Sequence, residues 1–216
     1  MKKTLIFGVM LGLFFGACDS QSGSSTKVDT SASCHTCFKL DKAQEEAKQK
    51  AAHSPKYRFA LSDVAVFSAD GKQEIGTMIK GYGGEILQEL GDKVLLEVKG
   101  FTKEGDSLHL YSAPDSELAT LRLTQPAGEL PLKVAVKKSE LSESEGEVWS
   151  KAEFIYYDNC SMCHAAHAPK EHTIQEWEGI YGTMKAFAMP TEENDALIWE
   201  YLQAHANDSF ALDDEQ

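Results

Sequence analysis

The spacing of apolar residues changes along this chain, and that change most constrains its fold. Between residues 57 and 136, short apolar or alternating segments such as VLLEV at 94–98 are separated by turn signals such as ADG at 69–71. Short strands with turns at such spacing are typical of a small antiparallel barrel or sandwich. From Ser139 onward, apolar residues recur at helical spacing instead. We therefore expect an α+β chain, in which a small SH3-like antiparallel β-barrel at 57–136 precedes an α-helical domain at 137–216.

Two helices are expected in the C-terminal part. One precedes a pair of cysteines, where five apolar residues recur at helical spacing. The other begins near Glu192, because Pro190-Thr191 places a proline just before a capping residue. The segment between the two helices is more polar, and we expect a loop there. The apolar residues are Val148, Trp149, Ala152, Ile155 and Tyr156 in the first helix and Leu197, Ile198, Tyr201 and Leu202 in the second.

The cysteine pair after the first helix is Cys160 and Cys163, and His164 follows directly. At this spacing two thiols can form thioether bonds to the vinyl groups of a haem, and the adjacent histidine can bind the iron. A monohaem c-type cytochrome domain has the same order of elements along the chain: a helix, CxxCH, a loop, a methionine and a second helix. We expect one covalently bound haem c; the alternative is a coincidental disulfide beside a surface histidine. No second CxxC with zinc spacing lies nearby, which disfavours a zinc ribbon.

Two methionines, Met184 and Met189, compete for the opposite face of the iron. A thioether ligand raises the reduction potential of a haem, whereas a second histidine lowers it. A proline follows Met189, as is often the case for the distal methionine of small soluble cytochromes c. His167 and His172 lie in the expected loop, but His167 comes only three residues after the histidine of the motif and could hardly reach the opposite face. Both methionines remain candidates from the residues alone.

The first residues predict export from the cytoplasm. Two lysines precede an apolar run at 5–17, which is too short to span a bilayer as a helix. The sequence FGAC resembles the bacterial lipobox, although Phe15 replaces the usual leucine. We expect residues 1–17 to be a signal peptide and Cys18 to carry lipid; an ordinary cleaved signal with an incidental cysteine is the alternative. Asp19 resembles the signal that keeps lipoproteins on the inner membrane, which predicts a membrane-anchored periplasmic protein.

The charge of the chain limits its partners. The formal net charge of the 216 residues is −13, and loss of residues 1–17 with their two lysines makes it −15. Nucleic acid and anionic lipid surfaces repel such an acidic protein, so a basic protein surface suits it better. With only five cysteines, the chain is not a disulfide scaffold either.

A second CxxC lies in the segment 18–56, which we expect to be a tether with a short helix at about 39–52. Cys34 and Cys37 have the haem spacing, but Phe38 stands where the histidine should be. In an oxidising compartment we expect a disulfide or a redox-active pair. An unusual haem site and metal binding with His35 or His53 are the alternatives.

The stretch from Tyr57 to Asp208 resembles the C-terminal half of the pentahaem c-type cytochromes that serve trimethylamine N-oxide and dimethyl sulfoxide reductases in the bacterial periplasm. In that family, the methionine seven residues after a tryptophan is expected on the iron, which implies Met184 here. The resemblance lies in VKGFT at 98–102, CSMCH at 160–164, Trp177, Gly179, Met184 and YLQ at 201–203.

The resemblance implies electron transfer rather than enzyme catalysis. We expect the chain to pass single electrons from a quinol-linked membrane dehydrogenase or another cytochrome to a periplasmic molybdenum-containing reductase. The family begins with a membrane helix and a four-haem domain; we expect neither here, so the chain should depend on another donor and on its lipid anchor. A haem-containing binding or sensor module that regulates or matures such a reductase is the alternative. Peroxidase activity is a third hypothesis, disfavoured by the two available methionines.

Overall fold

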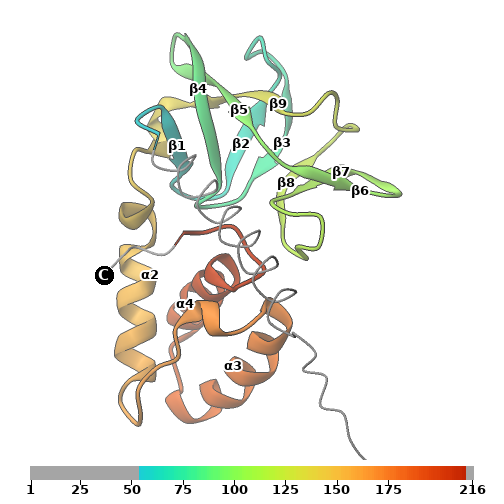
Figure 1. The fold of residues 1–216 in the computed structure, drawn as a ribbon. Helices are drawn as coiled ribbons and strands as arrows, with labels where there is room; N and C mark the ends of the chain where they lie inside the picture. The colour runs from blue at the N-terminus through green and yellow to red at the C-terminus, as the bar shows by residue number, and fades with distance from the viewer. Residues whose placement is uncertain (1–53, 213–216) are drawn as a thin grey trace, which may run out of the picture. The chain divides into compact units, whose positions relative to one another are not determined.

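The computed structural model describes residues 54–212, in which a β-sheet is followed by three α-helices (Figure 1). The strands are β1 (Tyr57–Ala60), β2 (Val64–Phe67), β3 (Glu74–Met78), β4 (Gly83–Leu90), β5 (Lys93–Val98), β6 (Phe101–Lys103), β7 (Asp106–Tyr111), β8 (Ala119–Leu123), β9 (Leu132–Lys137) and β10 (Leu141–Ser142). The α-helices are α2 (Glu145–Cys160), α3 (Ile174–Ala188) and α4 (Glu192–His205), and two short 3-10 helices are η1 (Lys138–Glu140) and η2 (Pro169–Glu171).

The strands of the described chain pair antiparallel in the order β10-β1-β4-β5-β9-β2-β3-β8-β7-β6. Strand β9 occupies a central place in this order. It pairs with β5 along its whole length, from Lys93 opposite Lys137 to Val98 opposite Leu132, and with β2 where Phe67 lies opposite Ala135. It therefore joins the strands on the β5 side to those on the β2 side.

Alternation of apolar and polar residues explains how the sheet forms its core. In β5, the side chains of Val94, Leu96 and Val98 are buried, and the residues between them are only partly buried. Successive side chains of a strand point to opposite faces of a sheet, so this pattern places one face of β5 in the interior. In β9 the consecutive residues 134–136 are all buried, which means that this central strand is covered on both faces.

Each α-helix begins at a residue suited to cap it. The side chains of Ser144, Thr173 and Thr191 accept hydrogen bonds from backbone amides three residues later, at the starts of α2, α3 and α4 respectively. Helix α3 has a complete capping box, because the Glu176 carboxylate also accepts from the Thr173 amide at 2.9 Å. These caps satisfy amides that the first turn of a helix leaves without partners.

The sheet and the helices share one hydrophobic core. The indole of Trp149 in α2 lies so close to Gly81 that a Cβ atom at this glycine would overlap the ring. Tyr82 meets Phe210 edge to face at 5.3 Å between ring centroids, and Lys80 pairs with Glu200 of α4 at 2.9 Å. The helical part is therefore packed onto the sheet rather than joined to it only by the chain.

The expected fold class is wrong. Instead of a small SH3-like barrel followed by an all-helical cytochrome domain, the described chain has a large ten-stranded antiparallel sheet and three α-helices. The segments expected to be strands, at 64–67, 76–79, 86–87, 94–98, 108–111 and 120–123, correspond to β2, β3, β4, β5, β7 and β8, whereas β1, β6, β9 and β10 were not anticipated. The central position of β9 extends the pairing into a larger sheet, and the core shared with the helices joins what was expected to be two separate domains.

The structure adds a helix where a loop was expected. Helix α3 occupies residues 174–188, in the polar segment between the two predicted helices. The predicted helices are present as α2 and α4, and α4 begins at Glu192 as expected. The signal peptide, Cys18, the pair Cys34 and Cys37, and the helix expected at 39–52 lie outside the described residues. Within residues 54–212, no helix combines the length and apolar character needed to cross a membrane.

Candidate cofactor site

Cys160 is positioned by the last turn of α2. Three buried residues of this helix, Trp149, Ala152 and Tyr156, recur at intervals of three and four, and Cys160 continues the same face. The helix ends there, with the Ser161 amide donating to the Tyr157 carbonyl at 3.0 Å. The Cys160 thiol is only partly buried, and this burial raises its pKa. A thiol with a raised pKa stays protonated at neutral pH and is a weak nucleophile until it is activated.

Cys163 and His164 follow in the turn after α2, and both are exposed. Both cysteines are free thiols, so the structure does not contain the alternative disulfide between them. The Nδ1 atom of His164 lies 2.8 Å from the carbonyl oxygen of Ala165. Because a carbonyl only accepts hydrogen bonds, Nδ1 must donate, which leaves Nε2 of the neutral ring with a free lone pair. Such an arrangement orients an imidazole for metal binding through Nε2.

Met184 lies on the inner face of α3. Ile174, Trp177 and Tyr181 are buried at the spacing of one helix face, and Met184 is the next residue on that face. Its side chain is nevertheless 38 % exposed, since the elements that cover the earlier turns do not cover this one. Met189 differs: it caps the end of α3 with a left-handed backbone (φ 47°) and is 79 % exposed. The face of α3 therefore favours Met184 as the residue directed toward a cofactor.

Tyr156 of α2 and Tyr181 of α3 each hold their helix to a neighbouring segment. The Tyr156 hydroxyl donates to the His167 carbonyl and the Tyr181 hydroxyl to the Asp195 carboxylate of α4, each at 2.7 Å. Burial raises the pKa of both phenols, and the hydrogen bond to Asp195 raises that of Tyr181 further. These bonds hold the two rings in fixed positions.

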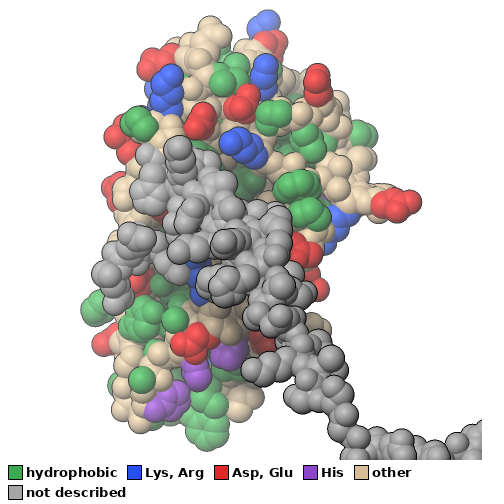
Figure 2. All heavy atoms as spheres, viewed as in Figure 1, with side chains coloured by type: hydrophobic (Ala, Val, Ile, Leu, Met, Phe, Trp, Pro, Cys, Tyr) green, Lys and Arg blue, Asp and Glu red, His purple; other side chains and the backbone are tan. Residues whose placement is uncertain are grey.

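Large apolar side chains are exposed on the helices that carry the candidate residues. The four most exposed in the described chain are Phe154, Met162, Phe187 and Met189, at 70–79 %, and all belong to α2, α3 or the turns that follow them. Figure 2 shows hydrophobic and histidine side chains close together on the visible face over the helices. Large apolar groups that are exposed on a helix can mark a surface that another apolar group covers.

The residues present fit a c-type haem. Two free thiols and a histidine with a free Nε2 are placed by one short turn, and a thioether continues the inner face of the neighbouring helix. Exposed apolar side chains lie on the same two helices. A haem needs these features: thiols for attachment, a nitrogen and a sulfur ligand for iron, and apolar surface for the ring.

Two other features of the described chain were missed from the sequence. His167, Glu171 and His172 form a group of neighbouring side chains, although their spacing was visible in the sequence. A cavity of about 620 Å³ lies between the sheet and the C-terminal segment. Aromatic rings of Tyr57, Phe59, Tyr82 and Phe210 line it together with the charged residues Glu85, Glu97, Lys99 and Glu145. The cavity joins residues far apart in the sequence, so no local pattern could have indicated it.

Comparisons of the chain with protein-family models, with curated proteins and with solved structures find no match.

Proposed function

We propose that this protein is an electron-transfer protein with one haem c attached to Cys160 and Cys163. The observation that carries the proposal is the combination of the CxxCH turn with exposed apolar surface on α2 and α3. Either feature alone has a simpler explanation, because cysteine pairs also form disulfides and single exposed apolar residues are common. Together they supply attachment, ligation and covering surface in one place.

Each residue has a definite task in this proposal. Cys160 and Cys163 would hold the cofactor through thioether bonds, and His164 would bind the iron through Nε2. The hydrogen bond from His164 Nδ1 to the Ala165 carbonyl keeps the ring oriented and makes the imidazole a stronger ligand. Met184 would supply a second protein ligand to the iron, and its sulfur would raise the reduction potential. Haem c supplies an iron that alternates between the ferric and ferrous states and so carries one electron at a time.

The direction of transfer comes from the resemblance and from the expected location. We propose that the protein is anchored through Cys18 at the periplasmic face of the inner membrane. There it would accept electrons from a quinol-linked dehydrogenase or another cytochrome and deliver them to a molybdenum-containing reductase of the trimethylamine N-oxide or dimethyl sulfoxide type. The net charge of −15 after loss of residues 1–17 favours partners with basic docking surfaces.

The first test is the attachment itself. The protein is coexpressed with the haem attachment machinery, and haem per chain is measured by mass spectrometry and by the pyridine haemochrome spectrum. We expect one covalent haem in the wild-type chain and none in a Cys160→Ala/Cys163→Ala variant. The matched control is Cys34→Ala/Cys37→Ala, which removes the other CxxC and should retain one haem. A wild-type chain without covalent haem under these conditions contradicts the proposal.

The second test identifies the axial ligand. Met184→Ala and Met189→Ala form a matched pair, because each removes one exposed thioether near the end of α3. We expect the methionine-to-iron charge-transfer band in the magnetic circular dichroism spectrum to vanish in Met184→Ala and to survive in Met189→Ala. The reverse result assigns Met189, and survival of the band in both variants excludes both residues as ligands.

The cavity beside the sheet favours a second candidate, a haem-containing binding or regulatory module. Its aromatic lining and four charged side chains are suited to holding a ligand or a partner segment. One measurement, oxidation of the reduced protein by the reductase, distinguishes the two functions. Rapid oxidation of the reduced protein by the reductase, only when the reductase substrate is present, supports electron transfer; binding to the reductase without oxidation supports the regulatory role.

A further inference from the structure

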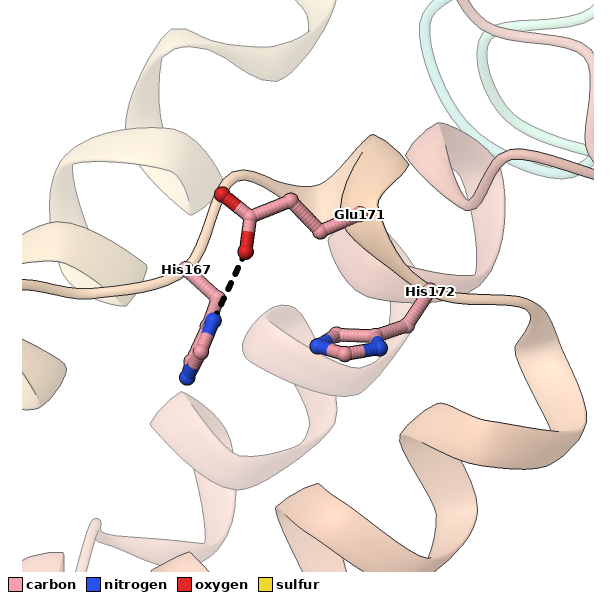
Figure 3. A group of neighbouring side chains, drawn as sticks. All are labelled: His167, Glu171 and His172. Atoms are coloured by element: carbon pink, nitrogen blue, oxygen red, sulfur yellow. Dashed lines mark hydrogen bonds and ion pairs between the residues drawn. The ribbon is translucent and has the colours of Figure 1, made fainter.

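His167, Glu171 and His172 lie together in the segment between α2 and α3 (Figure 3). Each offers one atom that can bind a metal, and these atoms are all within 4.8 Å of one another. Figure 3 shows the two rings and the carboxylate facing a common space. Two imidazoles and one carboxylate are a ligand set used by protein sites for zinc and other first-row divalent metals.

The backbone of this group is held by contacts outside it. The His167 carbonyl accepts a hydrogen bond from the Tyr156 hydroxyl at 2.7 Å, and the His172 carbonyl accepts one from the Asn207 amide at 3.0 Å. Between them, the indole nitrogen of Trp177 donates to the Pro169 carbonyl at 2.7 Å. Hydrogen bonds to the backbone on either side of the ligands limit the entropy that ordering them on an ion would cost.

The polar atoms of the three side chains differ in whether they have hydrogen-bond partners. His167 Nδ1 lies 2.7 Å from Glu171 Oε2, an interaction that lowers the pKa of Glu171 together with the Ala168 amide. The Glu171 carboxylate is therefore charged at neutral pH. In contrast, Nε2 of His172 is buried and has no hydrogen-bond partner among the described residues, while its ring packs edge to face on Trp177. A buried ring nitrogen without a partner is unfavourable unless something binds it.

We propose that His167, Glu171 and His172 form a binding site for one divalent first-row metal ion, with zinc as its best representative. Tetrahedral zinc with ligand bonds of about 2.0–2.1 Å places its ligand atoms about 3.3 Å apart. The widest pair must therefore close by at most about 1.5 Å, which side-chain rotation can achieve. Coordination through Nδ1 of His167 replaces its hydrogen bond to Glu171 and moves the ring proton to Nε2. Three protein ligands leave a further position for water.

The ion would fix the segment 165–173, which connects the CxxCH turn to the start of α3. His167 precedes η2, Glu171 is the last residue of η2, and His172 follows it. The site uses none of the residues assigned to haem, so it does not depend on the proposed function. Magnesium and calcium prefer oxygen ligands and are not expected to bind here.

The test measures zinc binding to the full mature chain, purified without a histidine tag. Free thiols are reduced and alkylated first, so that Cys34, Cys37 and any cysteine without haem cannot bind the ion. Competition with a chromophoric chelator then gives affinity and stoichiometry, and thermal unfolding is followed with and without zinc. We expect one zinc per chain and a higher midpoint with zinc, but no shift with magnesium.

His167→Ala and His172→Ala should each weaken zinc binding by at least about tenfold, since even loss of an outer-shell partner costs that much. Glu171→Gln keeps the size of the side chain and should also weaken binding. His109→Ala is the matched control, because His109 also pairs with a carboxylate, that of Asp106 at 2.9 Å, without belonging to a three-residue group. Absence of zinc binding in the wild-type chain, or unchanged affinity in both His167→Ala and His172→Ala, overturns the proposal, whatever the haem content.

Discussion

The sheet and the helices differ in how completely they bury their apolar side chains. In the sheet, Leu96, Leu110 and Leu121 are fully buried, and the large apolar residues that remain exposed there are 39–47 % accessible. In α2 and α3 the inner face is buried, whereas Phe154 and Phe187 are 70 % and 75 % exposed. These two helices carry large apolar side chains that the described chain does not cover, which is consistent with a role in holding a cofactor.

The largest effect is expected from a substitution within the sheet. Leu96→Ala removes a fully buried side chain and leaves a cavity, which should lower the free energy of unfolding by about 2–5 kcal/mol. Phe187→Ala removes a larger but exposed ring and should change it by no more than about 0.5 kcal/mol in haem-free protein. Urea denaturation of both variants measures the difference. If Phe187→Ala lowers the free energy of unfolding of haem-free protein as much as Leu96→Ala does, the Phe187 side chain is already buried. The helices would then not differ from the sheet in burial.

The next effect tests the contact between the two regions. Gly81→Ala places a Cβ atom at a left-handed position (φ 77°), where it overlaps the Trp149 ring. The backbone penalty and the overpacking together should cost about 2–4 kcal/mol. Gly105→Ala is a matched control, because Gly105 has a similar φ of 79° but nothing within 4 Å of its Cβ position. It should show the backbone penalty alone, about 1–2 kcal/mol. Equal costs would mean that Trp149 moves away freely and that helices and sheet are weakly joined.

The local sequence pattern predicted part of this fold. The apolar face of α2 and the proline and threonine before α4 are signals within a few residues, and both helices are present. Helix α3 was missed even though Thr173 and Glu176 form a capping box and Ile174, Trp177 and Tyr181 share a face. Its exposed charged residues gave the segment a polar character that obscured this face.

The sheet was predicted less well than the helices, and the reason is physical. Strand β9 has the alternating pattern of a strand, but its place between β5 and β2 depends on pairing between residues far apart in the chain. No local pattern specifies such partners, so neither the size of the sheet nor its shared core with the helices could be inferred.

The candidate site also has a part that the sequence predicted and a part that it did not. Cys160, Cys163 and His164 form a motif within five residues, and Met184 followed from a family resemblance. The approach of His172 to Glu171 and His167, in contrast, depends on how the backbone of this segment folds. A motif of residues close in sequence can be recognised by its spacing. The relative positions of the side chains in space can be known only from the structure.

A smaller effect should appear when haem is removed from the folded protein. If haem covers the ends of α2 and α3, Cys160→Ala/Cys163→Ala should increase amide hydrogen exchange there by about tenfold to a hundredfold. Amides of β5 and β9, which lie in the centre of the sheet, should exchange as in the wild-type protein. Exchange is measured by mass spectrometry on peptides from both regions. Equal acceleration in the sheet would show that the two regions open as one unit, and no acceleration in the helices would show that haem does not cover them.

The smallest effect concerns the hydrogen bond that joins Tyr181 of α3 to Asp195 of α4. The Tyr181 hydroxyl donates to Asp195 Oδ1 at 2.7 Å and lowers the pKa of this carboxyl below its ordinary value of 3.8. Asp195 is partly exposed, so Tyr181→Phe should cost only about 0.5–1 kcal/mol at neutral pH. A depressed folded-state pKa contributes stability above the unfolded pKa and loses it as the pH falls through the folded value. The difference between Tyr181→Phe and wild type should therefore shrink below about pH 3.8 in urea denaturation. A cost that stays constant down to pH 2 would assign the effect to packing of the ring and not to the hydrogen bond between α3 and α4.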